Sequence, residues 1–317
     1  MNASHSHITR VLVVGAGQMG AGITQLFASR GIAVTLTDIT EQILNHTLVK
    51  IRQSLERMAE EGLMETSGID AAMDRIRIST QLEEAVQGAG FVVENVSESL
   101  PLKQEIFRCL DSLCPPEVVL ATNTSVISIT EIAKSATRPE RILGTHFWNP
   151  PELIPLVELV PGERTAPQSV EIAFSFLAAL GKHPVRVKQD APGAVGTRLQ
   201  HALWREALSI VEQGIADAEG VDEVVKYGFG MRLPALGPLE TAELIGLDLT
   251  LAIQDYLLKH LESSPTPSPL LVQKVEQGHL GFKSGFGFRE WTPEGINQTR
   301  ANLEAHLFQW HRAQHTP

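Results

Sequence analysis

The sequence predicts an α/β protein in which a doubly wound, mostly parallel sheet is followed by an all-helical C-terminal domain. Two observations support this. In residues 1–192, short β-branched runs alternate with longer helical patterns, which is typical of the crossover units of parallel sheets. Beyond Asp190-Ala191-Pro192-Gly193 the strand signal nearly vanishes and long helical stretches follow. Because Pro-Gly pairs punctuate elements, we expect one α/β domain over 1–192 and a second, helical domain over 193–317.

The strands are expected where short runs are rich in Val, Ile and Thr, and the helices where apolar residues recur three and four apart. In chain order the expected strands are Val11–Val14, Ala33–Thr37, Arg75–Ser79, Phe91–Glu94, Val118–Ala121, Ile142–Thr145, Leu153–Val160 and His183–Val187. The helices expected between them are Gln18–Arg30, 40–63, the turn Leu82–Gln87, Leu102–Leu113, Ile127–Ser135 and 167–180. The helices expected after them are Val195–Glu212, Ala218–Tyr227, Leu239–His260 and one from Pro293.

Composition narrows the class of protein. The chain has 317 residues, of which 43% are hydrophobic, enough for two domains with a large core. Its formal net charge of −11 argues against nucleic-acid binding. Cys109 and Cys114 form neither a disulfide framework nor a zinc-like pattern, so we expect no metal. No run is long enough to span a membrane, and the polar segment Met1–Thr9 is not a signal peptide, so we expect a cytoplasmic protein.

A glycine-rich motif follows the first expected strand and opens the first expected helix. Its residues Gly15, Gly17, Gln18, Met19 and Gly20 fit G-x-G-x-x-G with Ala16, the fingerprint of a Rossmann dinucleotide site. The first glycine permits the tight turn, the second lets a pyrophosphate approach, and the third lets the helix pack on the sheet. The helix N-terminus then offers unpaired N–H groups to the phosphates. We expect these five residues to contact a dinucleotide.

The expected cofactor is NAD, because Asp38 ends the second strand 18 residues after Gly20. An acid at that place accepts hydrogen bonds from the ribose hydroxyls. It would also repel the 2′-phosphate of NADP, and Ile39–Leu48 contains no Arg or Lys to compensate.

Three polar segments leave expected strands at the carboxyl edge, where ligands of open parallel sheets bind: 94–98, 123–125 and 146–151. Oxidation of an alcohol needs a base for the hydroxyl proton, and the imidazole of His146 suits that role near neutral pH. Glu158, on the next expected strand among apolar neighbours, would orient it. A lone histidine or strand glutamate is often structural, but here both lie near an expected NAD site.

These residues resemble those of the L-3-hydroxyacyl-CoA dehydrogenase family, and the 12-residue spacing of His146 and Glu158 is a specific part of the likeness. The matching stretches are Gly15–Asp38, Glu94–Phe107, Asn123–Ser125, Gly144–Val160, Gly181–Val185 and Gly237–Asp248. The resemblance implies a Rossmann domain with a helical, dimer-forming C-terminal domain, a role in fatty acid metabolism, and a 3-hydroxyacyl-CoA or related hydroxy acid as substrate.

The resemblance also implies residue roles. His146 would be the base and Glu158 its partner. Ser125 would bond the substrate oxygen, and Asn149 would help shape the site. Three further residues are implied to lie near the cofactor, namely Glu98, Lys103 and Asn123.

Two departures from the family leave the substrate open. Thr197 stands where the family usually has an asparagine near the substrate. Family members that use CoA carry lysines on the helix after the second strand, whereas residues 54–62 here hold three acids and one arginine. Acids there would repel CoA phosphates. Some branches of the family act instead on small free acids such as L-gulonate, carnitine or pyridine carboxylates.

Two functions therefore stay open within the dehydrogenase class, one with a CoA thioester and one with a small free acid. A free acid needs a cation for its carboxylate, and Arg198 or Arg232 is a candidate, although either could form a structural ion pair. A rival of another class is a non-catalytic NAD-binding protein. We expect a small-molecule substrate, neither nucleic acid nor membrane as a partner, and a homodimer.

The dimer is suggested by an apolar stretch in the C-terminal half. Its residues are Leu239, Leu244, Ile245, Leu247, Leu249, Leu251 and Ile253. This stretch is too apolar for one exposed helix, so it forms either the core of its own domain or an interface. The family resemblance favours a C₂ homodimer through the helical domain.

Overall fold

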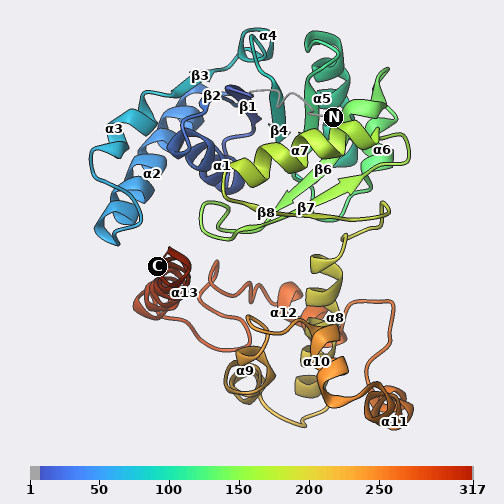
Figure 1. Ribbon diagram of the computed structural model, residues 1–317. Helices are drawn as coiled ribbons and strands as arrows, with labels where there is room; N and C mark the ends of the chain where they lie inside the picture. The colour runs from blue at the N-terminus through green and yellow to red at the C-terminus, as the bar shows by residue number, and fades with distance from the viewer. Residues whose placement is uncertain (1–7, 316–317) are drawn as a thin grey trace. The chain divides into compact units, whose positions relative to one another are not determined.

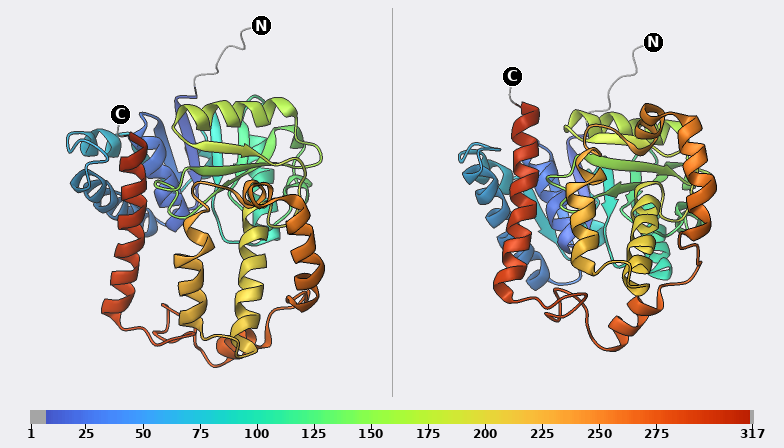
Figure 2. Two further views of the ribbon diagram at one scale, coloured as in Figure 1. Left: turned by 60° about the horizontal axis from the view of Figure 1, so that its bottom comes forward. Right: turned by 90° about the horizontal axis from the view of Figure 1, so that it is seen from below.

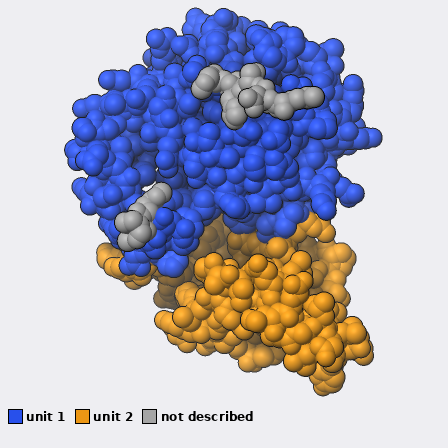
Figure 3. All heavy atoms as spheres, in the orientation of Figure 1, with its two compact units in different colours: residues 1–197, 304–317 blue, residues 198–303 orange. Residues whose placement is uncertain are grey.

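The protein is described by a computed structural model, which describes residues 8–315 (Figure 1). Most of the polar N-terminal segment discussed above lies outside the described residues. The chain divides into two compact units, residues 1–197 with 304–317 and residues 198–303 (Figure 3). Because the end of the chain groups with the sheet, a division into 1–192 and 193–317 stays a proposal. No helix in the described part is both long and apolar enough to cross a membrane.

The first unit is built on one eight-stranded sheet of order β3-β2-β1-β4-β5-β6-β7-β8. Its strands are β1 (Arg10–Val14), β2 (Ala33–Thr37), β3 (Ile76–Ser79), β4 (Phe91–Glu94), β5 (Val119–Thr122), β6 (Ile142–Phe147), β7 (Leu156–Pro161) and β8 (His183–Arg186). All neighbours pair in parallel except β6 and β7. The strand order reverses between β1 and β4, the crevice where doubly wound sheets bind ligands. The predicted Rossmann-like, mostly parallel sheet is confirmed.

Helices cover both faces of this sheet. They are α1 (Gln18–Ser29), α2 (Glu41–Glu60), α3 (Gly68–Met73), α4 (Leu82–Ala85), α5 (Leu100–Leu113), α6 (Ile129–Ala133), the 3₁₀ turn η1 (Pro139–Arg141) and α7 (Pro167–Ala179). Alternate residues of β1 enter different cores: Val11 and Val13 pack with α1, α2, α3 and α7, and Leu12 and Val14 with α4, α5 and α6. Both faces of the strands are buried, which explains their nearly continuous apolar sequences.

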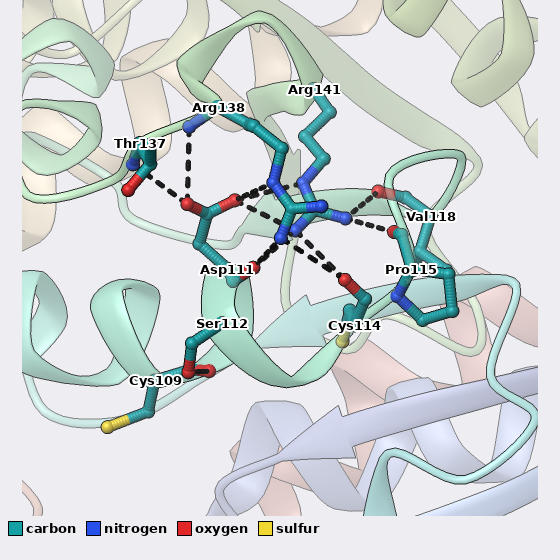
Figure 4. A network of polar contacts seen from close by, with 9 residues as sticks. All are labelled: Cys109, Asp111, Ser112, Cys114, Pro115, Val118, Thr137, Arg138 and Arg141. Atoms are coloured by element: carbon teal, nitrogen blue, oxygen red, sulfur yellow. Dashed lines mark hydrogen bonds and ion pairs between the residues drawn. The ribbon is translucent and has the colours of Figure 1, made fainter.

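A buried ion-pair network ties the end of α5 to the approach to β6 (Figure 4). Asp111 accepts hydrogen bonds from Arg141 Nη2 at 2.8 Å and from the N–H of Thr137 at 2.8 Å, and Arg138 Nε lies 3.2 Å away. Burial alone would raise the pKa of Asp111, but these hydrogen bonds hold it below its ordinary value. The network fixes the connection that delivers β6 to the sheet.

The second half of the chain is helical, as predicted. Its elements are α8 (Gly196–Glu212), α9 (Ala218–Tyr227), η2 (Phe229–Met231), α10 (Pro238–Ile245), α11 (Leu247–Leu257), η3 (Leu258–His260), α12 (Pro269–Glu276) and α13 (Pro293–His315). The single helical stretch expected over 239–260 is broken by Gly246, whose φ of +98° no α-helix accommodates. The strand expected from Leu153 begins only at Leu156, after the turn over residues 151–153 and the irregular residues Ile154 and Pro155.

Candidate active site

The glycine turn between β1 and α1 has the shape that the motif predicts. Gly15 has a φ of +95°, and a Cβ there would lie 2.9 Å from the Asn95 backbone. A Cβ at Gly20 would collide with the carbonyl oxygen of Gly15, so helix and strand touch here. A Cβ at Gly17, in contrast, would meet nothing within 4 Å. Packing of the protein therefore does not require this glycine, and the open space suits an approaching pyrophosphate.

Asp38 follows β2 and lies beside this turn. Its Oδ2 accepts the backbone N–H of Ala16 at 2.6 Å, and its Oδ1 accepts that of Ile39 at 2.7 Å. The N-terminus of α1 has no side-chain cap, so its N–H groups are available to phosphate oxygens. An open glycine, a helix N-terminus and an adjacent carboxylate fit a dinucleotide without a 2′-phosphate. Gln18 and Met19 lie in the first turn of α1, where Met19 packs partly on the core.

Lys103 binds groups at the carboxyl end of β4, the strand next to β1 in the sheet. Its side chain is 1% exposed, and its ammonium donates to Glu94 Oε1 at 2.8 Å, to Oε2 at 3.1 Å and to the Val96 carbonyl at 3.3 Å. Thr122 also donates to Glu94, at 2.7 Å. In the described structure Lys103 thus binds protein groups that shape the end of β4.

Glu98 holds the loop after β5. Its Oε1 accepts the N–H groups of Ser125 at 3.0 Å and Val126 at 3.2 Å and the hydroxyl of Thr124. Burial would raise the pKa of Glu98, but the hydrogen bond from Thr124 and the charge of Lys103 lower it below its ordinary value. The neighbouring Asn123 side chain accepts the N–H of Phe147 at 2.8 Å and so joins the ends of β5 and β6.

His146 and Glu158 face each other directly across the antiparallel pair β6 and β7. His146 Nδ1 lies 2.9 Å from Glu158 Oε2, and its Nε2 lies 3.2 Å from the hydroxyl oxygen of Ser125. His146 is 7% exposed and Glu158 2%. Burial would raise the pKa of Glu158, but the hydrogen bond from His146 and two backbone N–H groups lower it. The carboxylate orients the imidazole, which can then exchange a proton at Nε2.

Glu158 has three further donors that the sequence alone did not indicate. Trp148 Nε1 donates to Oε2 at 3.3 Å, and the N–H groups of Val195 and Gly196 donate to Oε1 at 2.9 and 3.0 Å. In the sequence, Trp148 is marked by its place two residues after His146, and Val195 and Gly196 by the Pro-Gly turn before α8. One carboxylate therefore connects the imidazole to the start of α8.

Asn149 lies in the loop between β6 and β7, and Lys182 binds the backbone of the same loop. Asn149 Oδ1 accepts the side-chain N–H of Gln18 at 3.1 Å, which links this loop to the glycine turn. Lys182, which the sequence did not single out, is 8% exposed and donates to the carbonyls of Pro151 at 2.5 Å and Ile154 at 2.6 Å. These bonds hold the loop that carries Asn149.

The expected substrate residues fall in different parts of the chain. Thr197 lies in the first turn of α8 and is 9% exposed. Arg198 and Arg232 are exposed and belong to the unit formed by residues 198–303. Their predicted role as partners of a substrate carboxylate stays a prediction. No group of three or more His, Cys, Asp or Glu in the described residues could hold a metal ion.

The end of α13 packs against α2 within the first unit (Figure 2). Arg57 on α2 bonds to Glu304, and Glu61, just after α2, accepts Arg312 Nη1 at 2.9 Å. Phe308 is 4% exposed. A cavity of about 210 Å³ lies between α2 and α13. Its lining includes Lys50, Arg57, Glu152, Glu304 and Phe308. The C-terminal half of α13 thus faces α2 across this cavity and is linked to it by ion pairs, while Lys50 and Arg57 remain exposed.

Comparison with known proteins identifies the class. Residues 10–191 match the NAD binding domain of 3-hydroxyacyl-CoA dehydrogenase, and residues 193–291 match the C-terminal domain of 3-hydroxyacyl-CoA dehydrogenase. Fold, glycine turn and matched domains together define an NAD-dependent dehydrogenase. The chain belongs to the 3-hydroxyacyl-CoA dehydrogenase family, as its sequence motifs predicted, and the non-catalytic alternative is set aside.

Two kinds of relative are similar over nearly the whole chain. A probable 3-hydroxybutyryl-CoA dehydrogenase of Bacillus subtilis is 39% identical and covers 90% of this chain and 98% of its own. The 5-formyl-3-hydroxy-2-methylpyridine 4-carboxylate 5-dehydrogenase of Mesorhizobium japonicum is 33% identical, over 93% of each chain. Among solved structures, a dehydrogenase of this pyridine acid, an NAD⁺-dependent dismutase, superposes with a TM-score of 0.89 at 31% identity, covering 96% of this chain and 98% of its own.

A solved (S)-3-hydroxybutyryl-CoA dehydrogenase of Ralstonia eutropha superposes less closely. Its TM-score is 0.75 at 33% identity, and it covers 90% of this chain and 99% of its own. The family match ends at residue 291, before α13 begins at Pro293. The pyridine-acid enzyme, by contrast, covers 96% of this chain, so it extends over part of α13.

Proposed function

We propose that the substrate is a small free acid and not a CoA thioester, and that the protein oxidises its alcohol carbon, or its aldehyde carbon as the hydrate formed with water, with NAD as the hydride acceptor. The observation that carries this proposal is that α13 places carboxylate and guanidinium partners on α2 and on the residue that follows it. In CoA-using members of the family, lysines of this helix are expected to hold the CoA phosphates. Here a chain segment beyond the family match forms ion pairs with Arg57 of that helix and with Glu61, just after it.

The charges of α2 support the same choice. Its two arginines already have carboxylate partners, because Arg52 Nη1 lies 3.0 Å from Asp70 and Arg57 bonds to Glu304. Glu56 and Glu60 add negative charge to the same helix. A 3′-phosphate brought to Arg52 or Arg57 would have to displace a carboxylate partner, and one brought to Glu56 or Glu60 would approach an acid. At an effective dielectric near 20, one such contact at ~4 Å costs on the order of 4 kcal/mol before screening by solvent.

In the proposed reaction His146 takes the proton of the substrate hydroxyl at Nε2. Ser125, 3.2 Å from that atom, hydrogen-bonds the same substrate oxygen. Glu158 holds the imidazole in the required orientation and balances the charge that forms on it. The glycine turn and Asp38 would hold NAD, which accepts the hydride at C4 of its nicotinamide when bound. Asn149 and Thr197 are proposed to shape the substrate site.

The carboxylate of a free acid needs a cationic partner, and we propose Arg198 or Arg232 for it. Loss of turnover in Arg198→Ala or in Arg232→Ala, with NAD affinity kept, would identify the partner. We also propose that the protein is a cytoplasmic homodimer that pairs through its helical part.

A substrate panel tests this proposal. The wild type is assayed for NADH formation with 3-hydroxyacyl-CoAs and with free hydroxy acids and pyridine carboxylates that bear a hydroxymethyl or formyl group. We expect turnover of a free acid and weak reduction of acetoacetyl-CoA. Efficient reduction of acetoacetyl-CoA, with a KM in the tens of micromolar, would overturn the free-acid proposal.

A thioester substrate is the second candidate, and two observations favour it. Relatives up to 39% identical are named as 3-hydroxybutyryl-CoA dehydrogenases. Lys50 lies on α2 and lines the cavity beneath α13, where it could meet a phosphate. The same panel separates the two candidates, because only a thioester-specific enzyme requires the CoA moiety for turnover.

A further inference from the structure

We propose that Trp148 is a positioning residue of the active site: its indole fixes the Glu158 carboxylate so that one oxygen faces His146 and the other faces the start of α8. This inference rests on the proposed role of His146 as the base. Trp148 itself is not proposed to exchange a proton or to contact the cofactor.

The first argument is the sharing of one oxygen atom. Glu158 Oε2 accepts both His146 Nδ1, at 2.9 Å, and Trp148 Nε1, at 3.3 Å. Two donors from different directions leave the carboxylate little freedom to rotate about its terminal bond. Since Oε1 is held by two backbone N–H groups, at 2.9 and 3.0 Å, all four contacts require the same orientation. A buried carboxylate that is fully bonded in one orientation is a rigid guide for the imidazole.

The second argument is the fit of the indole between the imidazole and α8. The rings of Trp148 and His146 have centroids 5.4 Å apart at 53°. On its other side the indole touches Gly196, where a Cβ would lie 2.4 Å from Cζ2 and 3.2 Å from Cε2 of the ring. Gly196 is therefore required by the indole, and the indole fills the space between the base and the first turn of α8.

The third argument concerns charge. Among the described residues, the titratable group that acts on Glu158 is His146. The other three donors to Glu158 are neutral. The indole N–H is one of the groups that stabilise the ionised carboxylate. Its removal makes the carboxylate more basic and strengthens its hold on a protonated imidazole. Trp148 therefore acts on His146 through Glu158 and not through the reacting atoms.

The test compares Trp148→Phe with the wild type and with Trp204→Phe, which replaces an exposed tryptophan of α8. We expect Trp148→Phe to lower kcat about three- to tenfold with little change in the KM for NAD. The acid limb of its kcat/KM profile should move to higher pH by about half a unit. Trp204→Phe should move neither quantity. An unmoved acid limb with unchanged kcat would overturn the proposal and leave Trp148 a packing residue.

Two further measurements keep the proposal falsifiable. The NMR titration of the His146 imidazole, assigned with His146→Gln, needs no substrate and should shift in the same direction in Trp148→Phe. It separates failure of this inference from failure of the proposed function, which would appear as inactivity on the substrate panel. Gly196→Ala would place a Cβ 2.4 Å from the indole and 3.3 Å from Glu158 Oε2 while keeping the N–H, so its effect on kcat should be larger in the wild type than in Trp148→Phe. Additive effects would contradict the proposed contact, and this variant carries the test if Trp148→Phe does not fold.

Discussion

His146 Nδ1 lies 2.9 Å from Glu158 Oε2, and the two residues are direct partners in the register of β6 and β7. We predict that His146→Gln lowers kcat by ~10² to 10⁴, the usual contribution of a general base, and leaves NAD affinity nearly unchanged. Glu158→Gln should lower kcat less than His146→Gln does, because Glu158 orients and stabilises the imidazole and does not accept the proton itself. Steady-state kinetics and NAD titration measure both, with the exposed His183→Gln as a control. Near-full turnover in His146→Gln would remove it from the mechanism.

Asp38 predicts the choice of cofactor. We expect a much higher kcat/KM with NAD than with NADP, because this carboxylate would repel a 2′-phosphate. Asp38→Asn is the sharper variant, since an amide oxygen can still accept the N–H of Ala16 that Asp38 accepts at 2.6 Å. We expect Asp38→Asn to lower the ratio of kcat/KM with NAD to kcat/KM with NADP about tenfold or more. Comparable kcat/KM for the two cofactors in the wild type would show that Asp38 does not face the ribose.

The parts of the site that follow strand ends were predictable from the sequence. The glycine turn and the alternating strands are encoded locally, and β6 and β7 are adjacent in sequence, so the spacing of His146 and Glu158 already indicated a pair. In contrast, nothing local shows that Glu98 reaches the loop of Ser125, 27 residues later in the chain.

Long-range contacts account for what the sequence did not reveal. Lys182 reads as an ordinary lysine after a glycine, because its two carbonyl partners come from a loop about 30 residues earlier. The return of α13 to α2 joins residues 57 and 304, which no periodicity indicates. The short helices α3 and α12 were also missed, since six and eight residues carry little periodic signal.

Lys182 predicts a pH dependence of stability. Burial lowers its pKa to about 8 from the ordinary 10.5, although Glu152 attracts its charge. Between pH 8 and 10.5 the unfolded chain binds a proton that the folded chain has released, so the free energy of unfolding rises with pH in this window, by at most about 1.4 kcal/mol per pH unit. Urea unfolding from pH 7 to 9, below the range where the raised pKa of the buried Cys114 thiol acts in the opposite direction, should show this rise in the wild type and in Lys134→Met, an exposed control, but not in Lys182→Met. Parallel curves for all three would contradict the assignment.

The helical part predicts self-association. Along α10 and α11, Leu239 is 79% exposed, Leu247 62% and Leu251 61%, so in a single chain this apolar stretch is not buried in a core. Burial of exposed Leu side chains contributes roughly 25 cal/mol per Å², which favours an interface. A two-fold arrangement would cover the same stretch on both copies.

We therefore expect sedimentation at micromolar concentration to give twice the chain mass of 34.6 kDa. Leu247 and Leu251 lie one turn apart on α11, so a charge at Leu251 would be placed within the apolar stretch. Leu251→Arg should shift the protein toward the monomer, because the arginine would lose its hydration at a dimer interface without a partner. Leu303→Arg, at an apolar residue of α13 that is 55% exposed, is the matched control and should remain dimeric. A clean monomer in the wild type, or a Leu251→Arg protein that associates as tightly as the wild type, would exclude this surface as the dimer interface.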